Sequence, residues 1–302
     1  DGVMACASCH FNAGVDNRTK NQIHPGQDGA FDIQPNAVLT PAHYPFRRLS
    51  SPDDRGTLLG DRDDCSGSQG VFSLDYVGFA PSQGGLEQGA FPSAPPVFQA
   101  GGTQVRQVTP RNAPSVINAA FNYVNFWDGR ASNIFNGVNP FGTGAPLSHQ
   151  ILRRSETGDL VPETVSLDFA SLASQALAPM VSSSEMAYAG RTLPQLGQKM
   201  LALTPLAKQD VHGQDSVLGS LSARPGRGLR AKEDGSSRTY ADLVAAAFKD
   251  EYWDHGREQM ENNFSLFAGL TLQAYERTLI SDDSRFDRFR EGLLDLTERE
   301  KR

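Results

Sequence analysis

Two cysteines and a histidine near the start of the 302-residue chain have the types and spacing of a cofactor site. Cys6 and Cys9 are three positions apart, and His10 follows directly. Two thiols at this spacing can form thioether bonds to the two vinyl groups of one porphyrin, and an adjacent imidazole can bind its iron. The C-x-x-C-H pattern therefore predicts a covalently attached c-type haem, with His10 as the proximal iron ligand.

Two other uses of the cysteine pair are weaker alternatives. A tetrahedral zinc site needs more ligands, but the only other cysteine, Cys65, stands alone, and no closely paired histidines follow. A thioredoxin-like dithiol needs a βαβ context, whereas the residues around this pair are rich in Asn and Gly. A zinc or dithiol site is thus the minority interpretation, and Cys65 is interpreted as a bystander thiol.

Composition limits the class of protein. Hydrophobic residues make up 38% of the chain and charged residues 21%, which is ordinary for a soluble globular protein. The net charge of −7 argues against a nucleic-acid partner, and no apolar run is long enough to span a membrane. Because haem is attached to c-type proteins after export, we expect a periplasmic or otherwise exported protein, whose export signal is not in these residues.

Apolar periodicity predicts an all-α fold with long loops, of the cytochrome c-like kind. Helices are expected over residues 114–125, 168–178, 193–203, 239–248 and 262–280. Pro114 suits a first helical position, Pro179 should stop the second helix, and Thr239 with Asp242 should cap the fourth. No useful β-alternation is visible. We expect loops over 11–110 and loop insertions near 133–165 and 212–238, because these segments lack helical periodicity.

Both ends of the sequence suggest a part of a longer chain. Thr297 and Glu300 have the spacing of a capping box, but the helix that they would open has no room before Arg302. Only five residues precede Cys6, too few for a helix that would pack against the haem-attachment turn.

Three further segments join the haem motif in a recognisable order. They are Arg111–Ser115 (RNAPS), Phe126–Ala131 (FWDGRA) and Ala274–Leu279 (AYERTL). Together with the haem motif they resemble the bacterial di-haem cytochrome c peroxidase family, which includes the MauG-type enzymes. The resemblance implies that residues 1–302 form the N-terminal, peroxide-reacting haem domain, and that a second haem domain lies beyond residue 302.

The resemblance also implies roles for single residues. Trp127 matches the tryptophan that relays electrons between the two haems. Gln175 and Pro179 match the distal pocket, and Glu185 matches the catalytic glutamate. Peroxide cleavage needs a group that takes a proton from one oxygen and returns it to the other, which a glutamate can do. Without the resemblance, Trp127 would be interpreted as a core residue and Glu185 as a solvated loop carboxylate.

The sixth position of the iron and a calcium site are implied less directly. Asn112 matches a calcium ligand, although one amide oxygen is far short of the six to eight that calcium takes, and otherwise it is a turn residue. Many members of the family carry a histidine just before the Asn-Ala-Pro segment, but residues 101–108 have none. We therefore expect an open sixth position, as in MauG-type members, with His24 and His43 as minor alternatives for an iron ligand.

The leading functional hypothesis is reduction of hydrogen peroxide, with electrons relayed through Trp127 from a second haem and supplied by a small cytochrome c or cupredoxin. The second hypothesis is MauG-like oxidation of a partner protein or organic substrate, including rubber-oxygenase-like chemistry. The non-enzymatic rival is an electron-carrier cytochrome, whose sixth ligand would be one of four methionines: Met180, Met186, Met200 or Met260.

Overall fold

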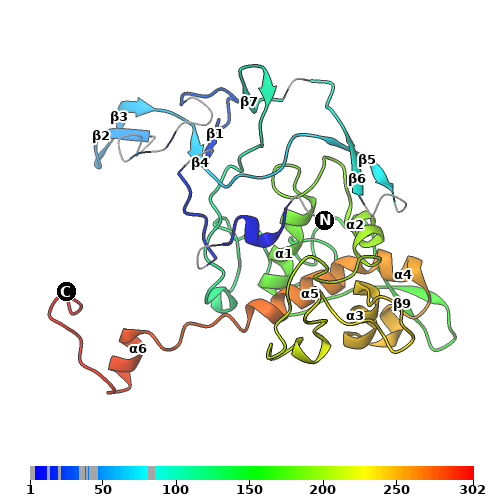
Figure 1. Ribbon diagram of the computed structural model, residues 1–302. Helices are drawn as coiled ribbons and strands as arrows, with labels where there is room; N and C mark the ends of the chain where they lie inside the picture. Colours follow the sequence, from blue (N-terminus) through cyan, green and yellow to red (C-terminus); the bar gives the residue numbers. More distant parts are fainter. Residues whose placement is uncertain are drawn as a thin grey trace.

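Small hairpins in the N-terminal half and short helices in the C-terminal half make up the fold (Figure 1). The computed structural model describes residues 4–11, 14–19, 22–33, 38, 40, 47–80, 86–94 and 96–302. Only 23% of the chain is helical, and 17% lies in strands of small sheets. The expected all-α fold is therefore wrong.

The α-helices gather around one centre, apart from the last one (Figure 1). They are α1 (Ser171–Val181), α2 (Leu193–Met200), α3 (Tyr240–Ala247), α4 (Arg257–Asn262), α5 (Phe264–Glu276) and α6 (Arg285–Arg290). Helices α1, α2, α3 and α5 confirm four expected helices, with shifted ends. The cap of α3 is as expected, because Thr239 Oγ1 accepts from the Asp242 amide. Pro179, however, lies inside the last turn of α1 instead of stopping it.

The helix expected over residues 114–125 is wrong. This segment holds only the 3₁₀ helix η4 (Ala119–Phe121), because Asn118 before it is left-handed, with φ 62°. The Asn118 amide donates to the Leu279 carbonyl at 2.9 Å, and its side-chain oxygen accepts from the Ser281 amide at 2.8 Å. These bonds to the chain beyond α5 hold the segment as a loop. Other 3₁₀ turns are η1 (Cys6–Ser8), η5 (Gly219–Leu221) and η6 (Asp250–Tyr252).

Among the described residues, the strands pair into two-stranded antiparallel sheets. The pairs are β1 (Ile23–His24) with β4 (Cys65–Ser66), β2 (Arg47–Ser51) with β3 (Asp54–Asp61), β5 (Asp75–Ala80) with β6 (Leu86–Ala90), β7 (Gln99–Ala100) with β8 (Thr103–Gln104), and β9 (Ile151–Arg154) with β10 (Leu160–Glu163). Four of these pairs fall in 11–110, which was expected to be loop. Their sequences lack a one-sided apolar alternation, because strands such as β6 are largely exposed.

The main core lies where α1 packs along α5. Its buried members are Phe135, Val138, Ile151, Val165, Ala170, Ala173, Leu177, Leu193, Leu196, Leu266 and Ala268. Residues 133–165, expected as an insertion, therefore supply a substantial part of the core. At Gly269 a Cβ would lie 2.7 Å from Phe135 Cζ and 3.0 Å from the Ala173 carbonyl oxygen, so the two helices approach too closely for a side chain there. Within the described ranges, no helix is long and apolar enough to cross a membrane.

Replacing Gly269 with alanine should lower the free energy of unfolding by about 1–3 kcal/mol, because the added methyl group overpacks the contact between α1 and α5. In an open helix the same change would raise stability by about 1 kcal/mol, so the sign is diagnostic. Urea denaturation of the purified protein measures it. The control is Gly213→Ala, where the methyl group meets nothing within 4 Å. A Gly269→Ala variant as stable as the wild type would contradict the close packing.

Candidate haem site

The C-x-x-C-H motif folds as one tight turn. The amides of Cys9 and His10 both donate to the Cys6 carbonyl, at 3.2 and 2.9 Å. The 3₁₀ helix η1 covers the first three residues of the motif, Cys6–Ser8. Cys6 is exposed, whereas Cys9 and His10 are half-buried. Both cysteines are free thiols. The turn therefore presents two thiols and one imidazole together near the surface.

The hydrogen bonds of His10 fix which ring nitrogen is available to a metal. Its Nδ1 lies 2.7 Å from the Gly14 carbonyl oxygen and 3.0 Å from the Pro114 carbonyl oxygen. Both partners can only accept, so Nδ1 carries the hydrogen and Nε2 keeps its lone pair. This is the tautomer that an Nε2 iron ligand needs, with the other nitrogen held by a backbone carbonyl. The bond to Pro114 also docks the motif onto a segment about a hundred residues away.

An ion pair between the buried Asp16 and the exposed Arg18 supports the same turn. Asp16 is 2% exposed, and its Oδ2 accepts from Arg18 Nη2 at 2.5 Å. The same nitrogen donates to the Ser8 carbonyl inside the motif at 3.2 Å. Burial by itself raises the pKa of Asp16, but the hydrogen bonds and charge of Arg18 outweigh it, so the pKa of Asp16 lies below its ordinary value. Asp16 is therefore a charged carboxylate that ties Arg18 to the motif.

Asn112 joins the motif to the Pro114 segment. Its Nδ2 donates to the Asp16 carbonyl at 2.7 Å, and its Oδ1 accepts from Ser68 Oγ at 3.2 Å. An amide oxygen has a second lone pair, so these bonds leave room for one cation contact. Calcium ligation by Asn112 stays a prediction.

Glu185 lies in a turn directly after α1. Three successive amides, those of Glu185, Met186 and Ala187, converge on the Ser182 carbonyl at 3.0–3.1 Å. Arg191 then holds both ends of this turn, because its Nη2 donates to the Met180 carbonyl at 2.5 Å and to the Met186 carbonyl at 3.2 Å. The half-buried Glu185 is thus fixed by its own backbone and by one guanidinium group.

Arg191 is part of a buried charge network that sequence reasoning missed. Its Nη1 lies 2.5 Å from a Glu87 carboxylate oxygen on β6, and Lys199 Nζ on α2 lies 3.5 Å from the other oxygen. The side chains of Arg191, Glu87 and Lys199 are only 4%, 11% and 5% exposed. Glu87 and Arg191 are 104 positions apart, so no local spacing could have linked them.

The turn that carries Glu185 packs against Gly70, whose neighbour Gln69 contacts the haem motif. A Cβ at Gly70 would overlap the Ser184 carbonyl oxygen, so only glycine fits at that approach. The neighbouring Gln69 carbonyl accepts from Cys9 Sγ at 3.6 Å. Burial raises the pKa of the Cys9 thiol; Arg18 lowers it, and the charges of Asp16 and Glu185 raise it further. Glu185 therefore stands close enough to act electrostatically on the motif.

A second glutamate, Glu276 at the end of α5, also acts on the motif and was missed, although its segment had been singled out. Burial raises the pKa of Glu276, and the nearby His10 lowers it. Although Cys6 is exposed as a residue, the protein around its thiol desolvates it and raises its pKa; a backbone hydrogen bond lowers the pKa, and Glu276 adds to the increase.

Trp127 stands apart from this centre, on an exposed turn. Its side chain is 75% exposed, so the alternative interpretation as a core tryptophan is wrong. The Arg111 guanidinium lies 4.5 Å from the centre of its ring, and Arg111 is also 3.7 Å from Asp128. Arg111 directly precedes Asn112, so the Trp127 indole contacts the same Asn112–Pro114 segment on which the motif docks. Gln175 and Pro179 lie one turn apart on α1 and are half-buried.

A comparison with family models decides the relationship. The model of the di-haem cytochrome c peroxidases matches residues 86–294, which is more than half of the chain. The chain belongs to the di-haem cytochrome c peroxidase family. Comparisons with curated proteins and with solved structures found no match. Membership makes the protein a haem-binding oxidoreductase.

The family match includes Asn112, Trp127, Gln175, Pro179 and Glu185 but begins after the haem motif. The hydrogen bond from His10 to Pro114 and the bond between Asn112 and Asp16 join the motif to the matched part. The haem motif is therefore in direct contact with the part of the chain that matches the family.

The donor set of the motif suits a c-type haem. Both cysteines are free thiols, and the hydrogen bonds of His10 Nδ1 leave the Nε2 lone pair for iron. Cys6, Cys9 and His10 therefore fit a covalently held haem.

The structure adds little support for His24 or His43 as an iron ligand. His24 lies in β1 with its ring 5.8 Å from that of Phe98, and its Nδ1 accepts from the Gly26 amide at 3.1 Å. Burial lowers the pKa of His24. His43 lies outside the described residues.

Replacing Asp16 with asparagine should cost about 1.5–3 kcal/mol of stability at pH 7, the range for hydrogen bonds to a charged group. The pKa of Asp16 is lowered by folding, so its stabilisation is present above the ordinary pKa of 3.8 and disappears as the pH falls through the lower folded value. Urea denaturation at pH 7 and pH 3 should therefore show a gap from the wild type that shrinks in acid. Asp168→Asn, at an exposed site, is the control. An equal gap at both pH values would contradict a charged Asp16.

Proposed function

We propose that this family member is a c-type haem peroxidase that reduces hydrogen peroxide to water with electrons received from a second haem. The observation that supports this best is the position of Glu185, whose turn packs against Gly70, next to the contact between Gln69 and Cys9, and is held by Arg191. A carrier cytochrome has no need for a carboxylate-bearing turn at this place.

Each residue of the site then has a separate task. The haem, when bound, supplies the iron at which peroxide is reduced. His10 would hold the iron through Nε2, while its Nδ1–H donates to the Gly14 and Pro114 carbonyls. Glu185 takes a proton from one peroxide oxygen and delivers it to the leaving oxygen, so that water departs instead of hydroxide. The Gln175 amide orients the peroxide or a neighbouring water.

Electrons would enter through Trp127. One peroxide needs two electrons and two protons to give two waters, so the site requires a route from outside. The exposed indole, with Arg111 above its ring, offers an aromatic group at the surface. We propose a second haem as the immediate donor and a small cytochrome c or cupredoxin as its source, in the periplasm or another exported location.

A specific observation favours MauG-like oxidation of a partner protein or organic substrate as the second candidate. Residues 101–108, which lack a histidine, lie against the Glu185 turn, because Gln107 Nε2 donates to the Ser183 carbonyl at 2.7 Å and the Gln107 carbonyl accepts from the Gly70 amide at 2.8 Å. No histidine from this segment can close the sixth position. This would match the MauG-type members, in which the sixth position of the iron is open.

The carrier hypothesis is weakened by where the methionines lie. Met260 is 7% exposed in a cluster with Leu201 and Phe267. Met180 and Met200 pack against the main core. Of the four methionines considered as a sixth iron ligand, Met186 in the Glu185 turn is the one that these contacts leave available.

Glu185→Gln should lower the second-order rate constant for hydrogen peroxide by roughly a hundredfold or more, because the amide cannot accept and return the proton. Stopped-flow mixing of the haem-loaded protein with peroxide measures this step directly. Glu156→Gln, at an exposed hairpin turn, should react like the wild type. Unchanged kinetics in Glu185→Gln would remove this residue from the mechanism.

Trp127→Phe should leave the peroxide step intact but slow turnover with a reduced donor protein, since only electron entry uses the indole. Comparing stopped-flow peroxide kinetics with steady-state oxidation of reduced cytochrome c separates the two steps, in protein that contains both haems. Phe286→Leu, at another exposed aromatic site on α6, is the control. Normal turnover in Trp127→Phe would exclude the relay.

A further inference from the structure

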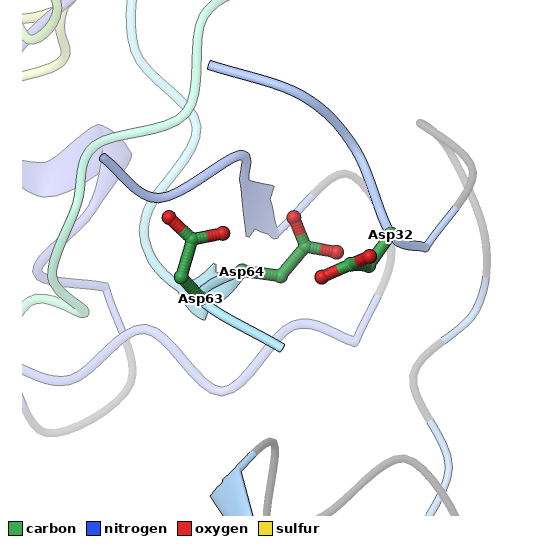
Figure 2. Close-up of side chains that lie close together, drawn as sticks. All are labelled: Asp32, Asp63 and Asp64. Carbon is green, nitrogen blue, oxygen red and sulfur yellow. The ribbon is translucent and has the colours of Figure 1, made fainter. Parts of the chain in front are cut away.

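Three aspartates converge outside the part of the chain that matches the family. Asp63 and Asp64 directly precede β4, and Asp32 lies in the segment that follows β1. Oxygen atoms of the three carboxylates all lie within 4.8 Å of one another. Figure 2 shows the Asp64 carboxylate between those of Asp63 and Asp32.

Asp64 is the unusual member of this cluster. It is only 2% exposed, and its Oδ2 accepts from the Ile33 amide at 2.7 Å. Its Oδ1 is buried and has no hydrogen-bond partner among the residues that the structure describes. A buried carboxylate oxygen without a donor costs free energy, and such groups in folded proteins usually have a partner or an ion. The orphan oxygen belongs to the side chain that lies at the centre of the cluster.

The neighbours make this cost larger. Burial raises the pKa of Asp64, hydrogen bonds from backbone amides lower it, and the charges of Asp32 and Asp63 raise it again. Asp63 is held in place by the amides of Gln27 and Asp28, which donate to its Oδ2 at 2.7 and 3.1 Å. The backbone therefore fixes like charges side by side, and only a cation or a shared proton can relieve their repulsion.

We propose that Asp32, Asp63 and Asp64 bind one calcium ion. The donors are carboxylate oxygens, which suit a hard cation and not the nitrogen- and sulfur-seeking zinc or copper. Two oxygens on one calcium ion, each at 2.3–2.6 Å, lie at most about 5 Å apart, and the observed spacing falls within that limit. Magnesium, at 2.0–2.1 Å, would need a tighter set. Water and backbone carbonyls would complete the shell.

The ion would act on the part of the chain that supports the haem motif. It would join the segment after β1 to the residues before β4, and these strands already pair through Ile23 with Ser66 and His24 with Cys65. The Gly67 amide next to β4 donates to the Gln22 carbonyl at 2.8 Å, and Gln22 Nε2 donates to Asp16 Oδ2 at 3.2 Å. Asp16 is the carboxylate that holds Arg18 to the motif. Calcium binding should therefore stabilise the whole N-terminal region, with or without peroxide turnover.

Isothermal titration of the calcium-depleted, haem-loaded protein with CaCl2 tests the proposal. The wild type should bind one ion at this site with a Kd of about 10⁻⁴–10⁻³ M, and its melting temperature should rise with calcium. Asp64→Asn keeps an oxygen for the Ile33 amide, and Asp32→Asn changes an exposed side chain. Both should weaken binding at least about tenfold, by loss of a charged ligand. Asp53→Asn, an exposed aspartate in the β2–β3 turn, should bind like the wild type.

Three results would overturn the site. They are absence of calcium binding by the wild type at millimolar concentrations, wild-type binding in both Asp64→Asn and Asp32→Asn, and a melting temperature that calcium raises equally in all variants. If Asp64→Asn does not fold, Asp32→Asn decides the question. Magnesium in place of calcium is the parallel titration, and equal or tighter magnesium binding would overturn the assignment of the ion.

Discussion

The whole site depends on the hydrogen bonds that His10 Nδ1 makes to the carbonyls of Gly14 and Pro114. A single 3₁₀ turn has almost no stability of its own, so the motif can be positioned only by partners elsewhere in the chain. Pro114 supplies one partner, Asn112 binds the Asp16 backbone, and Arg18 returns to Ser8. The same bond that docks the motif also selects the ring nitrogen that faces a metal. Position and chemical state of the ligand are thus set by one contact.

Much of what is local could be predicted. The C-x-x-C-H motif, the cap at Thr239 and the periodicity of α1, α2 and α5 each depend on residues within one or two turns. The helix expected over 114–125 failed because Asn118 takes a left-handed conformation and binds the chain beyond α5, a contact over 160 positions. The hairpins were missed because strands such as β6 are largely exposed, and the one half-buried residue of β6, Glu87, is charged, so no apolar side reveals them.

The candidate site shows the same division. Glu185 was found through the resemblance to the family, since its local sequence says only that a loop follows α1. What fixes Glu185 was out of reach: Gly70 against Ser184, and Arg191 bound to Glu87 across 104 positions. A guanidinium that is 4% exposed is costly to bury, and the Glu87 carboxylate repays that cost only in this geometry. The network therefore fixes the position of the Glu185 turn, but it adds little to the free energy of unfolding.

The Arg111 guanidinium over Trp127 has a consequence for the direction of charge movement. A cation 4.5 Å from the centre of an indole stabilises its electron-rich ground state and makes removal of an electron harder. An oxidised Trp127 would thus be high in free energy, and the oxidising equivalent would pass quickly to the next group. Asp128, 3.7 Å from Arg111 and 2.8 Å from Arg130, partly offsets that charge. In the proposed relay, the charges of Arg111, Arg130 and Asp128 would together set the reduction potential of the Trp127 indole.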